Sequence, residues 1–377
     1  MSEATATDPE AADEEAPLLS LDEIDVHFET NTGWNPFADA DIVQAVDDIS
    51  LDIGEGDVVV LVGESGSGKT TLGKTAVGLQ RPTNGSVRYR GQDVWDAKDG
   101  SGRIDIAYPE IRRSLQIVHQ DPGSALNPTQ TVLDSLTEPL EYRDESFDMS
   151  TRRRRVHEVL RQVNLEPAPG YASRYPHQLS GGEKQRVALA RAVLMNPDLI
   201  LADEAVSALD VSLRIEAMEL LLNLQDVFNT SYLFISHNLS NARYLAGKAD
   251  GRIGIMYLGK LVELGTPEEV LENPKHPYTS VLKWATPSLD LDAEDAGPPP
   301  VREIDIPDAT NPPSGCRFHT RCPYGRETCT SDEPELEAVQ DGQPVACFRQ
   351  YDDDHPYWSA EWLDADAAEQ ARRRNLK

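Results

Sequence analysis

The chain has 377 residues, of which 39% are hydrophobic, and 65 acidic against 35 basic residues give it a net charge of −30. This length suits one large α/β domain with a smaller unit, and no run of 18 apolar residues occurs, so we expect no membrane-spanning segment. The negative charge argues against nucleic acid or anionic lipid as a partner. Because the charge is spread along a lysine-poor chain, it favours a protein adapted to concentrated salt over an ordinary acidic cytosolic protein.

The N-terminal half predicts two kinds of structure. Residues 1–17 are acidic and rich in Ala and Pro, which predicts a disordered tail, not a signal peptide, on a protein that stays in the cytoplasm. Alternating apolar residues in 18–28, 42–53 and 85–94 predict a small antiparallel sheet. Residues 121–190 carry helical spacing with little strand signal, which predicts an inserted helical subdomain.

The strand and helix alternation then resumes. Strand 199–203, helix 213–228 and strand 231–236 predict a βαβ unit of a parallel core sheet, and Thr266, Pro267 and Glu269 predict a capping box that opens another short helix. The first domain is therefore expected over 18–285. A linker at 286–300, a small irregular unit with four cysteines at 301–350 and a polar tail at 351–377 complete the chain.

Residues 63–70 read Gly-Glu-Ser-Gly-Ser-Gly-Lys-Thr and match Gly-x-x-x-x-Gly-Lys-[Ser/Thr] at every fixed position. The glycines let backbone N–H groups face an anion, Lys69 adds charge toward the β- and γ-phosphates, and the Thr70 hydroxyl can bind Mg²⁺. A Gly/Ser-rich turn that matches by chance is the alternative. The predicted nucleotide-binding residues are Gly63, Ser65, Gly66, Gly68, Lys69, Thr70 and Thr71.

Two adjacent carboxylates, Asp203 and Glu204, end the apolar run 199–203. Neighbouring strand residues project differently, so one can face Mg²⁺ while the other faces the attacking water. We assign Asp203 to the metal and Glu204 as the general base. The alternative is a solvated strand end.

Residues 179–192 read LSGGEKQRVALARA, in which Ser180, Gly181 and Gly182 precede an amphipathic helix and form a second anion site at a helix N-terminus. This stretch resembles the signature motif of the ATP-binding-cassette (ABC) ATPases. The resemblance implies a P-loop NTPase cassette that binds ATP and Mg²⁺. It also implies that two cassettes pair head to tail, with each nucleotide between the phosphate loop of one and the signature of the other.

Further family elements are similar to short stretches of this chain. The resemblance implies that Gln120 contacts Mg²⁺ and the attacking water and moves with a membrane partner, and that Asp210 contacts the opposite cassette. It implies that His237 bonds the γ-phosphate and that Phe28 stacks on adenine. Taken alone, His237 would more often be a core histidine than a ligand, and a core position for Phe28 is nearly as common as a stacking one.

This chain departs from the family pattern at two positions, where Ala205 replaces the usual proline and Asn238 a common aspartate. Neither change removes a group assigned to chemistry.

Segments 117–128, 173–186 and 273–279 resemble the ATPase subunits of oligopeptide, dipeptide and nickel importers, and the likeness covers about 18–350. It implies two membrane permeases, an external solute-binding protein and a second cassette, commonly a different paralogue, at the cytoplasmic face of the membrane. We expect peptides as the solute, with nickel or an oligosaccharide as alternatives. A soluble cassette acting on nucleic acid or ribosomes is disfavoured by the single cassette and the negative charge. A module that traps ATP without turnover would lack Glu204 or His237.

All four cysteines, Cys316, Cys322, Cys329 and Cys347, lie in the C-terminal unit. In a reducing compartment, clustered thiols suggest a metal more than disulfides. Successive cysteines are separated by five, six and seventeen residues, so the chain contains no Cys-x-x-Cys pair. The absence of that pair disfavours a zinc site. The resemblance implies a [4Fe-4S] cluster, and zinc or plain thiols are the alternatives.

Overall fold

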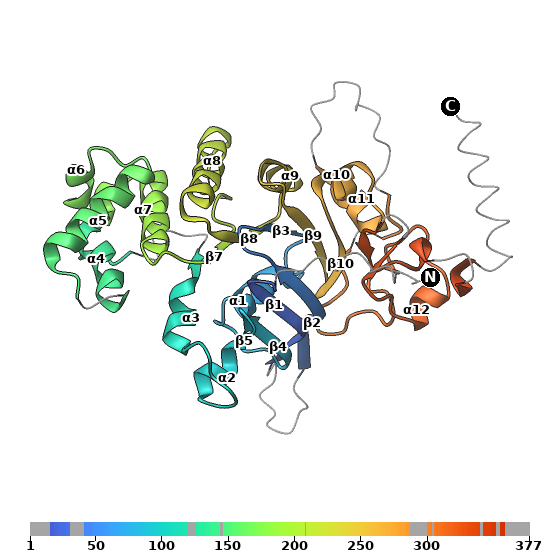
Figure 1. Cartoon of the computed structure of the whole chain (residues 1–377). Helices are drawn as coiled ribbons and strands as arrows, with labels where there is room; N and C mark the ends of the chain where they lie inside the picture. The colour runs from blue at the N-terminus through green and yellow to red at the C-terminus, as the bar shows by residue number, and fades with distance from the viewer. Residues whose placement is uncertain are drawn as a thin grey trace, which may run out of the picture.

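The computed structural model describes residues 16–30, 41–119, 126–143, 146–207, 209–286, 300–303, 305–339, 342–351 and 355–358. Gln120, nearly all of the two predicted tails and the centre of the predicted linker lie outside these ranges. Figure 1 shows a helical lobe at one end of the molecule, two sheets in the middle and the C-terminal segment at the other end.

An eight-stranded sheet forms the centre, in the order β11-β12-β10-β9-β3-β8-β7-β6. The strands from β9 to β6 run parallel, while β10, β12 and β11 pair antiparallel. Its strands are β3 (Val58–Val62), β6 (Leu115–Val118), β7 (Leu199–Asp203), β8 (Ser231–Ser236), β9 (Arg252–Tyr257), β10 (Lys260–Gly265), β11 (Glu337–Ala338) and β12 (Pro344–Val345). β3, β7 and β8 are buried throughout, as expected for parallel strands covered on both faces.

A four-stranded antiparallel sheet covers one face, in the order β2-β1-β4-β5. It comprises β1 (Leu19–Thr30), β2 (Asp41–Ile53), β4 (Asn84–Tyr89) and β5 (Gln92–Asp93), followed by the helices α2 (Val94–Asp99) and α3 (Tyr108–Ser114). Helix α1 (Lys69–Ala76) packs between the two sheets, where Leu72 joins Val59 and Leu61 of β3 in one buried cluster. The predicted antiparallel sheet beside a parallel one is confirmed.

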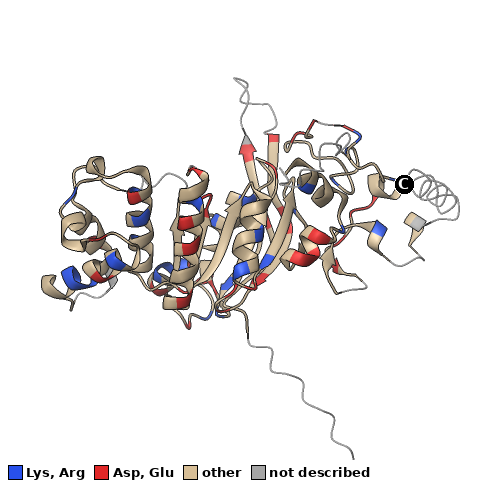
Figure 2. Cartoon of the chain, turned by 90° about the horizontal axis from the view of Figure 1, so that it is seen from above, with Lys and Arg blue, Asp and Glu red and all other residues tan. Residues whose placement is uncertain are grey.

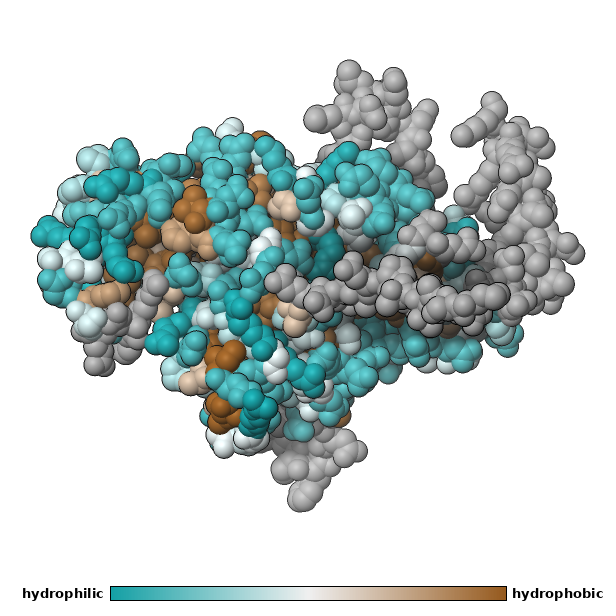
Figure 3. Space-filling view, viewed as in Figure 1, coloured by the Kyte–Doolittle hydropathy of each residue, from teal (hydrophilic) through white to brown (hydrophobic). Residues whose placement is uncertain are grey.

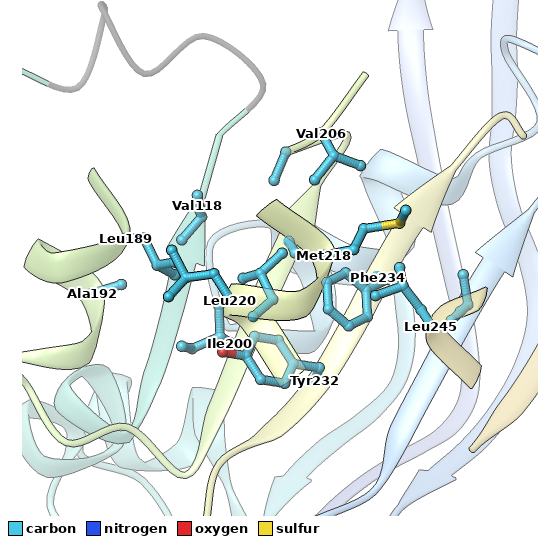
Figure 4. Close-up of a cluster of buried hydrophobic side chains, with 14 of the residues drawn as sticks. Val118, Leu189, Ala192, Ile200, Val206, Met218, Leu220, Tyr232, Phe234 and Leu245 are labelled. Atoms are coloured by element: carbon cyan, nitrogen blue, oxygen red, sulfur yellow. The ribbon is translucent and has the colours of Figure 1, made fainter. Parts of the chain in front are cut away.

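Helices cover the opposite face of the large sheet. They are α8 (Val211–Phe228), α9 (Leu239–Lys248), α10 (Pro267–Glu272) and α11 (Pro277–Ala285). Figure 4 shows Met218 and Leu220 of α8 against Tyr232 and Phe234 of β8, whose rings stack 4.9 Å apart. α10 begins at the predicted capping box between Thr266 and Glu269.

The helical lobe lies beyond β6 and contains α4 (Val132–Arg143), α5 (Met149–Gln162), α6 (Ala168–Ala172) and α7 (Gly181–Val193). It shares the main core, because Leu136 of α4, Leu160 of α5 and Leu189 of α7 belong to the same buried cluster as β7. The lobe is therefore packed onto the sheet through α7.

The C-terminal segment is irregular, as predicted, with α12 (Thr328–Ser331) its one α-helix among the described residues. It is nevertheless joined to the cassette, which no sequence pattern indicates. Val345 of β12 pairs with Glu263 of β10, and Phe318 and Cys322 belong to the main core. The segment thus shares its core with the nucleotide-binding domain.

Candidate functional site: a nucleotide-binding edge of the parallel sheet

The phosphate loop connects β3 to α1, which begins at Lys69 as expected. A Cβ added to Gly63 would collide with the carbonyl oxygen of Met256, and one added to Gly68 would collide with that of Ala45. Gly68 also has φ +97°, in the left-handed region that glycine favours. The pattern of glycines therefore follows from the close packing of the loop against β2 and β9.

Lys69 is buried, and its ammonium group donates to the carbonyl oxygens of Gly63 and Glu64 at 2.9 and 2.8 Å and to the Ser67 hydroxyl at 3.0 Å. Burial lowers the pKa of Lys69 to about 8, against the opposing effect of nearby carboxylates, Glu204 first. The loop thus holds a cation whose charge is poorly solvated, and an anionic phosphate would stabilise that charge.

Thr70 and Asp203 meet at the metal position that the sequence predicts. The Thr70 hydroxyl donates to the Asp203 carboxylate at 3.0 Å, and Asp203 is buried at the end of β7. A hydroxyl and a carboxylate are oxygen ligands of the kind that Mg²⁺ prefers. These two residues would hold Mg²⁺, which supplies positive charge to the β- and γ-phosphates when bound.

Glu204 and His237 follow the neighbouring strands β7 and β8, and His237 Nε2 hydrogen-bonds the Glu204 carboxylate. His237 Nδ1 lies 3.3 Å from the carbonyl oxygen of Gly63. Glu204 adopts φ +50°, a conformation uncommon for a residue with a Cβ and often found at functional sites. Together with Ser207 and Asn241 these residues line a cavity of about 200 Å³.

The signature residues lie elsewhere. Ser180 caps α7 and forms a capping box with Glu183. Beyond the helix's own backbone and the chain neighbours, no atom of a described residue lies within 4 Å of a Cβ added to Gly181 or Gly182. Figure 1 places α7 in the helical lobe, away from α1. Asp210 caps α8 by accepting the N–H of Leu213. Neither group makes a described hydrogen bond to the phosphate loop of its own chain.

Phe28 lies in β1 opposite Val43 and is 39% exposed. Since β2 packs against Gly68 at Ala45, the aromatic ring lies on the strand pair that approaches the loop. Gln120 lies outside the described residues.

Sequence reasoning missed three side chains that contact the site. The Gln185 amide of α7 donates to the carbonyl oxygen of Ala205, which ties the signature helix to the segment after Glu204. Glu64, inside the phosphate loop, is paired with Arg321 of the C-terminal segment. Glu64 occupies a variable position of the motif, and residues so distant in sequence give no pairing signal.

The four cysteines line one pocket beside His276 and Phe318. Burial raises the pKa of Cys322 to about 11 and that of Cys347 to about 12. Among the described residues, no three of the four sulfur atoms all lie within 4.8 Å of one another. The four thiols are therefore not gathered into one tight group in this structure.

Comparisons with known proteins agree with this geometry. The ABC transporter family matches residues 46–207, and the family described as "Oligopeptide/dipeptide transporter, C-terminal region" matches residues 262–329. An oligopeptide transport ATP-binding protein of Bacillus subtilis is 39% identical, covering 89% of this chain and 98% of its own. A dipeptide transport ATP-binding protein of Escherichia coli is 38% identical, covering 90% and 96%.

Solved structures match the cassette. The ATP-binding cassette MJ0796, described as a dimer bound to ADP and Pi, is 28% identical with a TM-score of 0.53, over 66% of this chain and 98% of that chain. CbiO1 of Clostridium perfringens, at 23% identity and a TM-score of 0.56 over 69% of this chain and 92% of its own, shares the fold. The chain therefore belongs to the ABC transporter family, as an ATP-binding cassette ATPase that carries the C-terminal region of the oligopeptide/dipeptide transporters.

Proposed function

We propose that this chain is the ATP-hydrolysing subunit of a peptide importer and works at the cytoplasmic face of the membrane as one half of a cassette dimer. The observation that carries the proposal is the convergence of Lys69, Asp203, Glu204 and His237 at one edge of the sheet. Relatives named for oligopeptide and dipeptide transport support peptides over nickel, oligosaccharides or nucleic acid.

In the proposed reaction, Lys69 and the loop N–H groups bind the phosphates of ATP. Glu204 accepts a proton from the attacking water, and His237, already bonded to Glu204, holds that carboxylate in place and contacts the γ-phosphate. Phe28 stacks on the adenine.

A second cassette would complete the site. Ser180 and the two glycines after it form a helix N-terminus at which Ser180 and Gly181 are exposed, and such a terminus binds anions. The dimer with ADP and Pi described for MJ0796 supports an arrangement in which this terminus faces the partner's nucleotide. Asp210, at the adjacent start of α8, would contact the partner.

A groove of about 610 Å³ between the helical lobe and β6 offers a place for a permease. Its lining includes Ile117, Pro139, Ala188 and Met195, together with His119, which directly precedes Gln120 in the chain. Figure 3 shows hydrophobic atoms at the surface where the lobe meets the sheets. Within the described ranges, no helix has the length and apolar character needed to cross a bilayer. The transmembrane path would then belong to two permeases, with a solute-binding protein outside.

We also propose that the cysteine pocket holds a [4Fe-4S] cluster. Thiolates bind iron–sulfur clusters. Burial raises the pKa of Cys322 and Cys347, and the nearby positive charges of Arg302 and Arg349 oppose part of that effect. Anaerobically purified protein should contain about four irons and four sulfides per chain, and Cys347→Ser should lower both. Zinc at one per chain, or no metal, would exclude the cluster.

The negative surface supports a protein that works at high salt. Figure 2 shows acidic residues in every part of the described chain, and their mutual repulsion falls as salt shortens the screening length. The free energy of unfolding should therefore rise between about 0.1 and 1 M KCl. An unchanged or lower value would indicate an ordinary acidic protein.

Peptide uptake tests the proposal as a whole. In a strain lacking this gene, labelled di-, tri- and longer peptides should enter slowly, and the intact gene should restore uptake while Glu204→Gln should not. Restoration by Glu204→Gln, or loss of nickel uptake alone, would contradict it.

A further inference from the structure

Arg321 of the C-terminal segment reaches into the phosphate loop. Its Nη1 and Nη2 atoms donate to the two carboxylate oxygens of Glu64 at 2.9 and 3.1 Å. Arg321 is 4% exposed, so this pair is largely withdrawn from water. A two-pronged arginine–carboxylate pair fixes orientation as well as charge.

A second contact holds the same loop residue. The Tyr278 hydroxyl of α11 accepts the backbone N–H of Glu64 at 2.8 Å. The Arg321 guanidinium lies 5.7 Å from the ring centres of both Tyr257 and Phe318, within the range of a cation–π contact. Glu64 is thus held by its backbone and by its side chain, from elements that the motif does not contain.

The charge of Glu64 matters for nucleotide binding. Its carboxylate is near enough to Lys69 to raise the pKa of that lysine, and the carbonyl oxygen of Glu64 accepts from the same ammonium group. An uncompensated carboxylate at this place would repel the phosphates of a nucleotide and compete with them for Lys69.

We propose that Arg321 is a positioning residue for nucleotide binding, which neutralises Glu64 and fixes the phosphate loop from the C-terminal segment. This proposal rests on the nucleotide site and is independent of which solute is transported.

The arginine is held by a compact turn. The backbone N–H groups of Arg321 and Cys322 both donate to the carbonyl oxygen of Phe318, at 3.0 and 2.9 Å. Cys322 lines the cysteine pocket. One five-residue turn, 318–322, therefore carries both the arginine that contacts the phosphate loop and a cysteine that lines the cysteine pocket.

Binding of Mg-ADP to the full chain tests the proposal, because ADP lacks the γ-phosphate that the second cassette contacts. Arg321→Ala should raise the Kd for Mg-ADP by about tenfold or more, since it leaves the Glu64 charge uncompensated. When the protein already carries Glu64→Gln, adding Arg321→Ala should raise the Kd for Mg-ADP by less than about threefold, because no carboxylate charge is left to neutralise. The Kd of Arg321→Lys for Mg-ADP should lie between those of Arg321→Ala and the wild type, since lysine keeps the charge but cannot form the two-pronged pair.

Arg326→Ala is the matched control. Arg326 is also buried in the C-terminal segment, where it packs 4.0 Å from the ring centre of Tyr357, but it makes no described contact with the loop. It should disturb the segment without raising the Kd for Mg-ADP comparably. The proposal would be overturned if Arg321→Ala and Arg326→Ala lowered the affinity for Mg-ADP equally. It would also be overturned if Arg321→Ala had the same effect on that affinity with and without Glu64→Gln. Either result would leave peptide import untouched.

Discussion

Glu204 and His237 are 33 residues apart in sequence and directly hydrogen-bonded in the structure. The contact follows from the fold, because β7 and β8 are parallel neighbours and both residues lie just past the carboxyl ends of these strands. Side chains from adjacent parallel strands meet at this edge, where ligands bind in open α/β sheets.

The first prediction concerns the general base. Glu204→Gln keeps the size and hydrogen-bonding reach of the side chain but cannot accept the proton of water. We expect steady-state phosphate release to fall about 10²- to 10⁴-fold while ATP binding persists. Glu216→Gln, an exposed change on α8, serves as the control and should retain turnover. Hydrolysis by Glu204→Gln at the wild-type rate would remove this assignment.

The second prediction follows from the pKa of Lys69, which burial lowers to about 8. Nucleotide phosphates bind the charged form, so they raise this pKa in the complex. Affinity for Mg-ADP should be constant below about pH 7.5 and should fall as the pH rises through about 8, by at most tenfold per pH unit.

The arginine variant controls for other titrating groups. Arginine does not lose its proton in this range, so the residual affinity of Lys69→Arg should not change between about pH 7 and 9.5. Calorimetry at several pH values measures both proteins. If the affinity of the wild type for Mg-ADP did not change with pH, Lys69 would have to stay charged in the free protein.

The third prediction concerns Glu263, a fully buried carboxylate in β10. It accepts the backbone N–H groups of Lys275 and His276 at 2.7 and 3.1 Å, the Gln343 amide at 2.9 Å and the Thr279 hydroxyl. In Glu263→Gln, an amide NH₂ group would replace one of the two accepting oxygens and would face a backbone N–H group, which can only donate. We expect this change to lower the free energy of unfolding by about 2–4 kcal/mol.

Glu268→Gln on α10 is the matched control, since Glu268 is exposed and its replacement should change the free energy of unfolding by less than about 0.5 kcal/mol. Chemical denaturation measures both variants. If the two variants had the same free energy of unfolding, the hydrogen bonds of Glu263, including the one from Gln343 of the C-terminal segment, would not contribute to stability.

The sequence predicts the parts of the fold that rest on local patterns. The capping box at Thr266, the strands β1, β2, β7 and β8 and the start of α1 at Lys69 each follow from a few neighbouring residues. Short apolar runs do not by themselves distinguish strand from helix. The clear helical pattern between β7 and β8 identifies these two as strands, whereas β6, β9 and β10 have no such neighbour and are not predicted.

The candidate site shows the same division. Thr70, Asp203, Glu204 and His237 belong to recognisable motifs, and the structure brings them together. The pairing of Glu64 with Arg321 joins residues 257 positions apart, and no local pattern encodes such a contact. The joining of the C-terminal segment to β10 depends likewise on long-range packing.

The central claim is that two cassettes share each nucleotide, and the mass of the protein in solution tests it most directly. Glu204→Gln, alone and mixed with a second peptide-importer cassette from the same organism, should be monomeric with Mg-ADP in sedimentation analysis. With Mg-ATP one of these samples should double in mass, and Ser180→Arg should prevent the doubling while leaving Mg-ADP binding intact. A single-cassette mass in both samples with ATP bound, or an ATP-driven dimer that Ser180→Arg leaves unchanged, would contradict the account.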